Sequence, residues 1–258
     1  MKYFAGIDVG ASTTKAIIIN GKKEILGYSV NDSGADFEVA AEQAFEDAKS
    51  GVGVVDENKS FVLSTGYGRR NVQFADSTKT EISCHAKGSF QEFPHAHTLI
   101  DIGGQDSKII KVDDSGKRIS FKMNRKCAAG TGAFLEEIAN RLKIPIGKLD
   151  GLAVKAKEET QLGSYCTVFT ATEILTKIRE GVEVEDLVKG IFGAVIKRAL
   201  EMDPLDGNIV MSGGVVAHNP FFVQMFSEKI GKEIFVPSLP QYTGALGAAL
   251  YALEEEGG

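Results

Sequence analysis

The sequence predicts an α/β protein built from two related halves, and three observations lead to this fold class. Strand-like and helix-like segments alternate along the 258 residues, and 43% of the residues are hydrophobic, enough for a substantial core. Residues 7–17 also align without a gap over residues 100–110. Each copy reads as an apolar strand ending in aspartate, a glycine-containing turn, and a second strand that runs back. We therefore expect two half-domains of similar design.

Both copies have the features of a phosphate-binding turn. Glycine allows close backbone approach, so the N–H groups of such a turn can point at an anion. Asp8 and Asp101 end the first strands, where one or two carboxylates together with substrate phosphates can hold Mg²⁺. One such turn alone would be no more than a β-hairpin. Two such turns at matching positions of the repeat predict that both halves bind the same polyphosphate.

Hydrophobic periodicity predicts the elements of the first half. We expect strands over 3–9, 13–19, 24–30 and 60–65 and helices over 36–50 and 80–90. Asn20-Gly21, between the second and third strands, is the dipeptide preferred in a type I′ hairpin turn. Gly66-Tyr67-Gly68-Arg69 is expected to form a structural turn.

The second half repeats this plan and then becomes mostly helical. We expect strands over 98–102, 108–112, 118–123 and 208–212, and helices over 128–142, 168–179, 183–202, 220–230 and 244–255. Gly213 and Gly214 follow the last strand, where adjacent glycines would let a flat base or ribose lie against the main chain. Taken alone, that segment reads as an ordinary strand-to-helix turn.

Charge and hydropathy exclude several classes of protein. A net charge of −6 provides no electrostatic footprint for nucleic acid or an anionic membrane. No apolar run approaches the ~20 residues that span a bilayer, and no basic segment followed by an apolar one opens the chain. We therefore expect a cytoplasmic location. The three cysteines do not form a small-protein disulfide framework and are expected to be thiols or metal ligands.

Cys127 and Cys166 each precede a predicted helix. A helix N-terminus and neighbouring cations such as Arg125 and Lys126 favour thiolate over thiol. One chain with two such cysteines cannot supply the four thiolates of an ordinary [4Fe–4S] cluster, but a two-fold dimer can. The alternative is two buried structural cysteines. Cys84 and His85 make an incomplete metal site, and we expect a buried thiol beside a partly exposed imidazole.

The three glycine-containing segments together resemble those of the actin, Hsp70 and sugar-kinase superfamily, in which two ribonuclease-H-like halves close on ATP. The resemblance covers essentially the whole chain. It implies a first phosphate motif at 7–15, a second at 100–108, an adenosine motif at 209–214 and crossing helices at 80–90 and 244–255. It also implies a first half at 1–95 plus 241–258 and a second half at 96–240.

Three further segments narrow the resemblance. They are Asp101-Ile-Gly-Gly-Gln-Asp106, Lys126-Cys127-Ala-Ala-Gly-Thr-Gly132 and Cys166-Thr-Val-Phe169. They are similar to segments of the ATP-dependent activators of 2-hydroxyacyl-CoA dehydratases, a family that includes the ATPase subunits of benzoyl-CoA reductase. The chain departs from that pattern at Arg125, Ala133 and Ala171, which bears on partner docking.

This resemblance implies a homodimer with one [4Fe–4S] cluster per dimer, held by Cys127 and Cys166 of each subunit. ATP hydrolysis would drive one low-potential electron from the cluster to an iron–sulfur dehydratase or reductase component. A ferredoxin- or flavodoxin-type protein would supply the electron. No nucleic acid or membrane is implied as a partner.

The implied nucleotide site uses ATP or ADP with Mg²⁺. Asp8 and Asp101 would organise Mg²⁺ and water, and Gln105 would place the attacking water. The residues expected to hold phosphates and adenosine are Gly10, Ala11, Ser12, Thr13, Thr14, Lys15, Gly103, Gly104, Gln105, Gly213 and Gly214.

Two other functions suit the same fold. One is a small-molecule, sugar-type kinase without a cluster, and the other is an actin-like ATPase that only changes shape. A kinase needs a base and a substrate pocket, for which the sequence offers no obvious residues, and it has no use for Cys127 and Cys166. We therefore expect an ATPase coupled to electron transfer.

Overall fold

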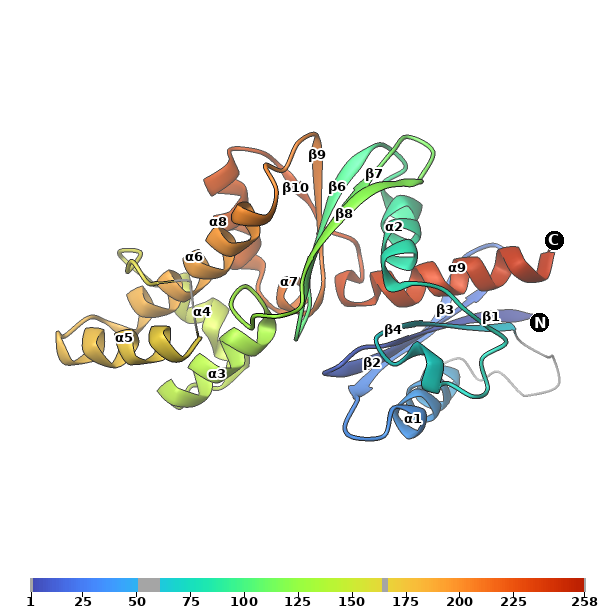
Figure 1. Cartoon of the computed structure of the whole chain (residues 1–258), viewed down its shortest axis with the longest axis horizontal. Coiled ribbons are helices and arrows are strands. Elements are labelled where there is room, and N and C mark those ends of the chain that lie inside the picture. The colour runs from blue at the N-terminus through green and yellow to red at the C-terminus, as the bar shows by residue number, and fades with distance from the viewer. Residues whose placement is uncertain (1, 51–60, 164–166, 258) are drawn as a thin grey trace. The chain divides into compact units, whose positions relative to one another are not determined.

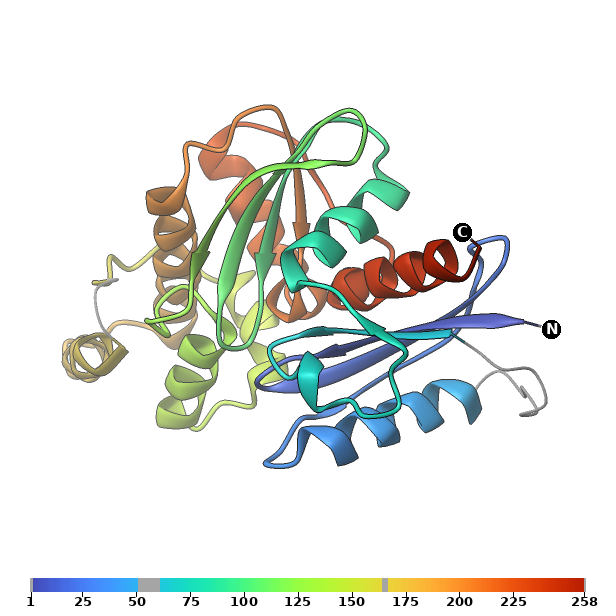
Figure 2. The same cartoon turned by 45° about the vertical axis from the view of Figure 1, so that its right-hand side comes forward.

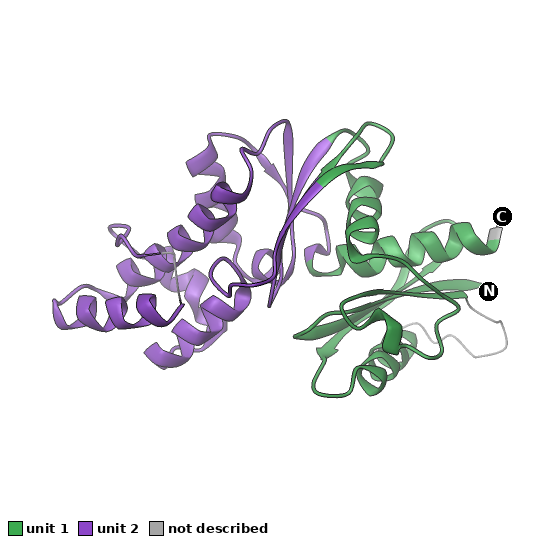
Figure 3. Cartoon of the chain, in the orientation of Figure 1, with its two compact units in different colours: residues 1–96, 111–120, 241–258 green, residues 97–110, 121–240 purple. Residues whose placement is uncertain are grey.

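The structure is a computed structural model that describes residues 2–50, 61–163 and 167–257 (Figure 1). The chain separates into two compact units, coloured in Figure 3. Unit 1 comprises residues 1–96, 111–120 and 241–258, and unit 2 comprises residues 97–110 and 121–240. Two five-stranded mixed sheets organise the fold, which confirms the expected α/β class.

The first sheet has the strand order β3-β2-β1-β4-β5. Its strands are β1 (Tyr3–Val9), β2 (Thr13–Asn20), β3 (Ile25–Asp32), β4 (Phe61–Gly66) and β5 (Ser77–Thr78). Every residue of β1 is buried, as expected for a central strand covered on both faces. β2 runs antiparallel to β1 and β4 runs parallel to it, which places Asp8 opposite both Lys15 and Thr65.

The second sheet has the order β10-β9-β6-β7-β8. Its strands are β6 (His97–Ile102), β7 (Ser107–Val112), β8 (Arg118–Asn124), β9 (Asn208–Ser212) and β10 (Ile234–Phe235). If β6 to β10 are matched in turn with β1 to β5, the two sheets have the same strand order. The gapless alignment of the two hairpins therefore reflects two halves with one topology.

Among the described residues of unit 1 there are three α-helices, α1 (Phe37–Ser50), α2 (Glu81–Glu92) and α9 (Thr243–Gly257), and a short 3-10 helix at Arg69–Asn71. Figure 2 shows α1 on one side of the first sheet and α9 on the other. α1 buries small side chains at helical spacing, Ala40, Ala41, Ala44 and Ala48. α9 packs backbone to backbone against β1 and α2, because a Cβ atom at Gly6, Gly88 or Gly247 would overlap main-chain atoms of the facing element.

Unit 2 contains the remaining helices that the structure describes. They are α3 (Gly132–Leu142), α4 (Leu149–Ala153), α5 (Thr167–Arg179), α6 (Val184–Met202), α7 (Gly214–His218) and α8 (Pro220–Ile230). The core joins α3, α6 and α8 through fully buried aromatic rings. Phe192 and Phe222 meet edge to face with ring centroids 5.5 Å apart, a favoured aromatic geometry.

Two local predictions were wrong. Asn20-Gly21 does not form a type I′ turn, because the left-handed residue is Lys23 (φ 65°). The Asn20 carboxamide oxygen accepts the N–H groups of Lys22 and Glu24 at 2.9 and 3.0 Å and so holds a longer loop. The helix expected from residue 128 begins at Gly132.

Among the described residues, no helix combines the length and apolar character needed to cross a membrane.

Candidate nucleotide site and cysteine loop

The first glycine turn joins β1 to β2 and is closed by a hydrogen bond from the Gly10 N–H to the Thr13 carbonyl oxygen at 3.1 Å. The Ser33 hydroxyl donates to the Gly10 carbonyl oxygen at 2.7 Å and lies 2.9 Å from the Thr14 hydroxyl. The ammonium of Lys15 bonds the Thr13 carbonyl oxygen at 3.2 Å. A compact turn therefore holds the predicted residues together, with Ala11 exposed at its tip.

Asp8 lies at the end of β1 with 8% of its surface exposed. A Cβ at Gly66 would lie 2.5 Å from Asp8 Oδ1, and one at Gly244 would lie 2.6 Å from Oδ2. His85 Nε2 is 3.0 Å from that second Cβ position. His85 is 6% exposed, so the expectation of a partly exposed imidazole was wrong. Because Gly66 and Gly244 have no side chains, the Asp8 carboxylate has room beside them. His85 Nε2 and Asp8 Oδ2 both lie close to the position that a Cβ of Gly244 would occupy.

The second glycine turn joins β6 to β7 and closes in the same way, with the Gly103 N–H donating to the Asp106 carbonyl oxygen at 2.9 Å. Gly103 and Gly104 are half-buried, and Gln105 is exposed at the tip. The structure thus brings the predicted residues of this hairpin into one turn, as in the first hairpin.

Asp101, at the end of β6, differs from Asp8 in its partners. The Ser212 hydroxyl donates to Oδ1 at 2.8 Å, and the Lys108 ammonium donates to Oδ2 at 3.2 Å. Lys108 also bonds Asp106 Oδ1 at 2.6 Å. Sequence reasoning missed Ser212, Asp106 and this use of Lys108. The only signal was the alignment of Lys108 with Lys15, and it does not say where either ammonium points.

Gly213 follows β9 and has φ 101°, a conformation that favours glycine. A Cβ there would overlap the main chain of Ile102 at the end of β6. The Gly213 N–H donates to the Pro240 carbonyl oxygen at 2.9 Å, and α7 begins at Gly214. The predicted adenosine motif therefore lies directly against the strand that leads into the second turn.

Cys127 lies in the loop between β8 and α3 and is half-buried. It is not at a helix N-terminus, as the sequence had suggested, because side chains hold the chain in a loop there. The Asn124 amide donates to the carbonyl oxygens of Cys127 and Ala129 at 3.0 and 3.1 Å. The Thr131 hydroxyl donates to the Ala128 carbonyl oxygen at 2.6 Å.

Hydrogen bonds join this loop to the second hairpin. The N–H groups of Gly132 and Ala133, which open α3, donate to the carbonyl oxygens of Gly103 and Gly104 at 2.8 and 2.7 Å. The hydroxyl of the buried Ser107 donates to the Gly130 carbonyl oxygen. Cys166 lies outside the described residues, and α5 begins at the next position.

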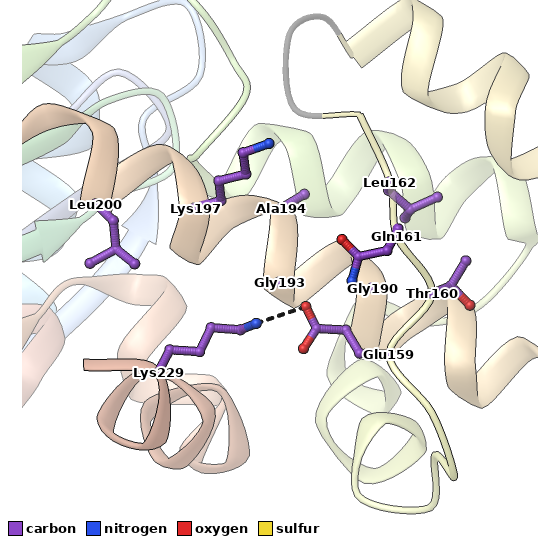
Figure 4. Close-up of a pocket in the computed structure, with 10 residues that line it drawn as sticks. All are labelled: Glu159, Thr160, Gln161, Leu162, Gly190, Gly193, Ala194, Lys197, Leu200 and Lys229. Atoms are coloured by element: carbon purple, nitrogen blue, oxygen red, sulfur yellow. Dashed lines mark hydrogen bonds and ion pairs between the residues drawn. The ribbon is translucent and has the colours of Figure 1, made fainter. Parts of the chain in front are cut away.

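A separate cavity of about 310 Å³ in unit 2 does not include any of these residues (Figure 4). It lies among α6, α8 and the segment that contains Glu159. The Lys229 ammonium bonds Glu159 Oε1 at 2.9 Å at its edge. Its lining shares no residue with the two hairpins or the cysteine loop.

Comparison with known proteins places the chain in a family. Residues 5–252 match the BadF/BadG/BcrA/BcrD ATPase family. The chain belongs to this ATPase family. It is 40% identical to the activator of lactoyl-CoA dehydratase from Anaerotignum propionicum, over 98% of both chains. It is 38% identical to the (R)-2-hydroxyglutaryl-CoA dehydratase activating ATPase from Acidaminococcus fermentans, again over 98% of both.

Solved structures agree with this family and with the predicted fold class. The activator of 2-hydroxyisocaproyl-CoA dehydratase from Clostridium difficile, with bound ADPNP, superposes with a TM-score of 0.91 at 38% identity, covering 98% of this chain and 95% of that one. A ROK family glucokinase from Streptomyces griseus shares the fold alone, with a TM-score of 0.55 at 13% identity over 98% of this chain and 99% of that one. The predicted fold class and family are confirmed.

Cys84, on α2, differs sharply from Cys127. Its side chain is fully buried, and this burial raises the pKa of the thiol from its ordinary 9.0 to about 12. The folded state therefore keeps a proton that the unfolded chain loses near pH 9, so the stability due to this group falls as the pH rises from 9 towards 12.

We expect iodoacetamide at pH 8 to alkylate Cys127 in the iron-free folded protein and to leave Cys84 unmodified, because only a thiolate reacts and Cys84 is both protonated and inaccessible. Peptide mass spectrometry would locate the label. In a denaturant, Cys84 should react as well. Equal labelling of the two cysteines without denaturant would contradict the buried position of Cys84.

Proposed function

We propose that the protein is an ATP-hydrolysing activator that delivers a low-potential electron to a 2-hydroxyacyl-CoA dehydratase or a related reductase. Relatives named as activators of such dehydratases align with nearly its whole length. The observation that carries the proposal is the hydrogen bonding between the turn of the second hairpin and the start of α3, directly after the Cys127 loop. These bonds connect the turn that we propose to bind nucleotide with the loop that carries a candidate cluster ligand.

In this proposal each hairpin contributes to holding Mg·ATP. Both turns close through the same N–H to carbonyl bond and carry glycine where a side chain would crowd the turn. Their amide groups, with Lys15, would bind phosphate oxygens. Asp8 and Asp101 would organise Mg²⁺ and water, Gln105 would orient the attacking water, and Gly213 and Gly214 would support the adenosine.

The residues around Cys127 suit a ligand to a metal cluster. The thiol is half-buried and accessible, and the positive charges of Arg125 and Lys126 adjoin it in sequence. Cys166, which precedes α5, would be the second ligand of each subunit, and the [4Fe–4S] cluster shared by two subunits would supply a one-electron reductant when bound.

The surface of α5 supports a contact with a second protein chain. Val168, Phe169, Leu175 and Ile178 expose between 41% and 75% of their surface on this helix. Exposed apolar groups of this kind mark protein–protein contacts. Because α5 follows Cys166 directly, we assign this surface to the homodimer that completes the cluster. The dehydratase or reductase component, and a ferredoxin- or flavodoxin-type donor, would be the redox partners.

ATP would act on the cluster through unit 2 itself. Phosphate binding at Gly103 and Gly104 would shift the turn, and the bonds to Gly132 and Ala133 would pass that shift to the start of α3. Ser107 provides a second connection, because its hydroxyl bonds the Gly130 carbonyl oxygen. ATP would favour one arrangement of the loop if it binds that arrangement more tightly than the other. The comparisons do not favour the sugar-kinase alternative.

Removing either aspartate should abolish most hydrolysis. Asp8→Asn and Asp101→Asn keep the side-chain size but remove the charge that organises Mg²⁺ and water, so kcat should fall by about 100-fold or more. The iron content should not change. Steady-state phosphate release, measured with an iron assay on the same sample, tests this. Hydrolysis at the parental rate in either variant would remove that aspartate from the proposed site.

Iron and sulfide counting on anaerobically purified protein tests the cluster. Because each chain offers two suitable thiolates, iron should approach four atoms per dimer. Cys127→Ala and Cys166→Ala should each abolish the brown colour, whereas Cys84→Ala should keep it because Cys84 is enclosed between α2 and α9. A colourless parent protein, or iron lost from Cys84→Ala alone, would contradict the ligand assignment.

The coupling predicts a difference between nucleotide states. Exchange of ADP for a non-hydrolysable ATP analogue should change the rate at which a chelator removes iron, and Ser107→Ala should reduce that change. Thr98→Val is the matched control, since it removes a buried hydroxyl that donates to the Asp206 carbonyl oxygen at 2.8 Å elsewhere in unit 2. Equal chelation rates in both nucleotide states would refute the coupling, and an equal effect of both variants would remove Ser107 from it.

A further inference from the structure

We propose that Lys108 is a positioning residue for ATP hydrolysis, which orients the Asp101 carboxylate and braces the turn of the second hairpin. The inference rests on the role proposed above for Asp101. Neither residue type nor spacing assigns this role, since Lys108 aligns with Lys15, which would bind phosphate.

The opposite charges of Lys108 and Asp101 are both buried. Only 5% of the Lys108 side chain and 4% of the Asp101 side chain are exposed. Asp106, the second partner of Lys108, is 25% exposed. An ammonium removed from water is costly unless it is paired with carboxylates and hydrogen-bonded. The Lys108 ammonium is therefore stabilised by carboxylates and not by bulk solvent.

The Asp101 carboxylate is held by a different donor at each of its oxygens. Lys108 bonds Oδ2 at 3.2 Å and Ser212 bonds Oδ1 at 2.8 Å, so rotation of the carboxylate about its terminal bond would break both contacts. The carboxylate is thus held in one orientation before any ligand arrives, which is the condition for effective positioning.

Lys108 also contacts the residue that closes the turn of the second hairpin. Lys108 bonds Asp106 Oδ1 at 2.6 Å, and the Asp106 carbonyl oxygen closes the turn by accepting the Gly103 N–H. A Cβ at Gly103 would lie 3.2 Å from both of these Asp106 oxygens. The ammonium therefore ties the strand-end aspartate to the turn that would contact phosphate.

The aligned lysine of the first hairpin provides the contrast. Lys15 Nζ lies 3.6 Å from the Cβ position of Gly10 and bonds the Thr13 carbonyl oxygen. Its ammonium thus stays with the turn, while that of Lys108 bridges two carboxylates. The two hairpins share a backbone plan but use the same residue type differently.

The test compares Lys108→Met with Lys15→Met in steady-state ATP hydrolysis. Lys108→Met should lower kcat about 100-fold, the effect of misplacing a reacting group by about 1 Å. Its KM for ATP should change less than about threefold, because ground-state binding is retained. Lys15→Met should mainly raise KM. Lys122→Met is the control, since Lys122 pairs with the buried Asp203 at 3.3 Å away from the hairpins, and its kcat should stay parental.

A second variant distinguishes a positioning role of Lys108 from a purely structural one, by removing the negative charge that Lys108→Met leaves unbalanced. Lys108→Met leaves Asp101 and Asp106 without their ammonium, so the melting temperature should fall. Adding Asp106→Asn should recover much of that fall but not kcat, since Asp101 is still not oriented. Lys108→Gln, which keeps a donor, should recover part of kcat. A double variant with parental kcat would overturn the inference, as would Lys108→Met with unchanged kcat.

Asp101→Asn in the same assay separates this inference from the proposed function. If that variant hydrolyses ATP at the parental rate, the role of Asp101 is wrong and Lys108 has nothing to position. If Asp101→Asn is slow while the Lys108→Met, Asp106→Asn double variant is fast, only the role of Lys108 is wrong.

Discussion

The first two amide groups of α3 donate to the carbonyl oxygens of Gly103 and Gly104, and the candidate functional part of unit 2 is built around this pair of bonds. The N–H groups at the start of any helix lack partners within the helix. Here the glycine turn accepts two of them, so the turn, the helix and the preceding Cys127 loop form one hydrogen-bonded framework. The buried Lys108 ammonium bonds Asp106 in the same turn and Asp101 in the strand before it.

Much of the fold could be predicted because its central strands are strongly apolar and its glycine turns repeat. The predicted β1 has the observed bounds, and β2 differs only at its end. The errors arose where side chains redirect the backbone. Asn20 binds two amides and so selects a longer loop than Asn-Gly usually forms. Asn124 and Thr131 hold residues 127–131 in a loop although the composition there is compatible with a helix.

The candidate site could be predicted as a set of positions but not as a set of contacts. Asp8 and Asp101 were found through the repeat, whereas Ser212 is 111 residues from Asp101 and meets it only because β9 pairs with β6. The pairing of β9 with β6 cannot be recognised from the sequence around either residue. The directions of Lys15 and Lys108 were only partly visible in the sequence. Asp106 stands where the first hairpin has Thr13 and supplies one partner of Lys108, but the contact of Lys108 with Asp101 is seen only in the packed structure.

The assembly of unit 1 from distant segments has a consequence for biosynthesis. The first glycine turn and the Ser33 hydroxyl that bonds it are complete by residue 33, but the backbone that faces Asp8 Oδ2 belongs to Gly244. At ribosomal elongation rates, the interval between the two is on the order of ten to fifty seconds. A nascent chain therefore carries the first glycine turn beside an incomplete set of Asp8 neighbours until α9 has been made. The packing of unit 1 is complete only when α9 emerges, whereas every segment of unit 2 precedes α9, so unit 2 is free to fold first.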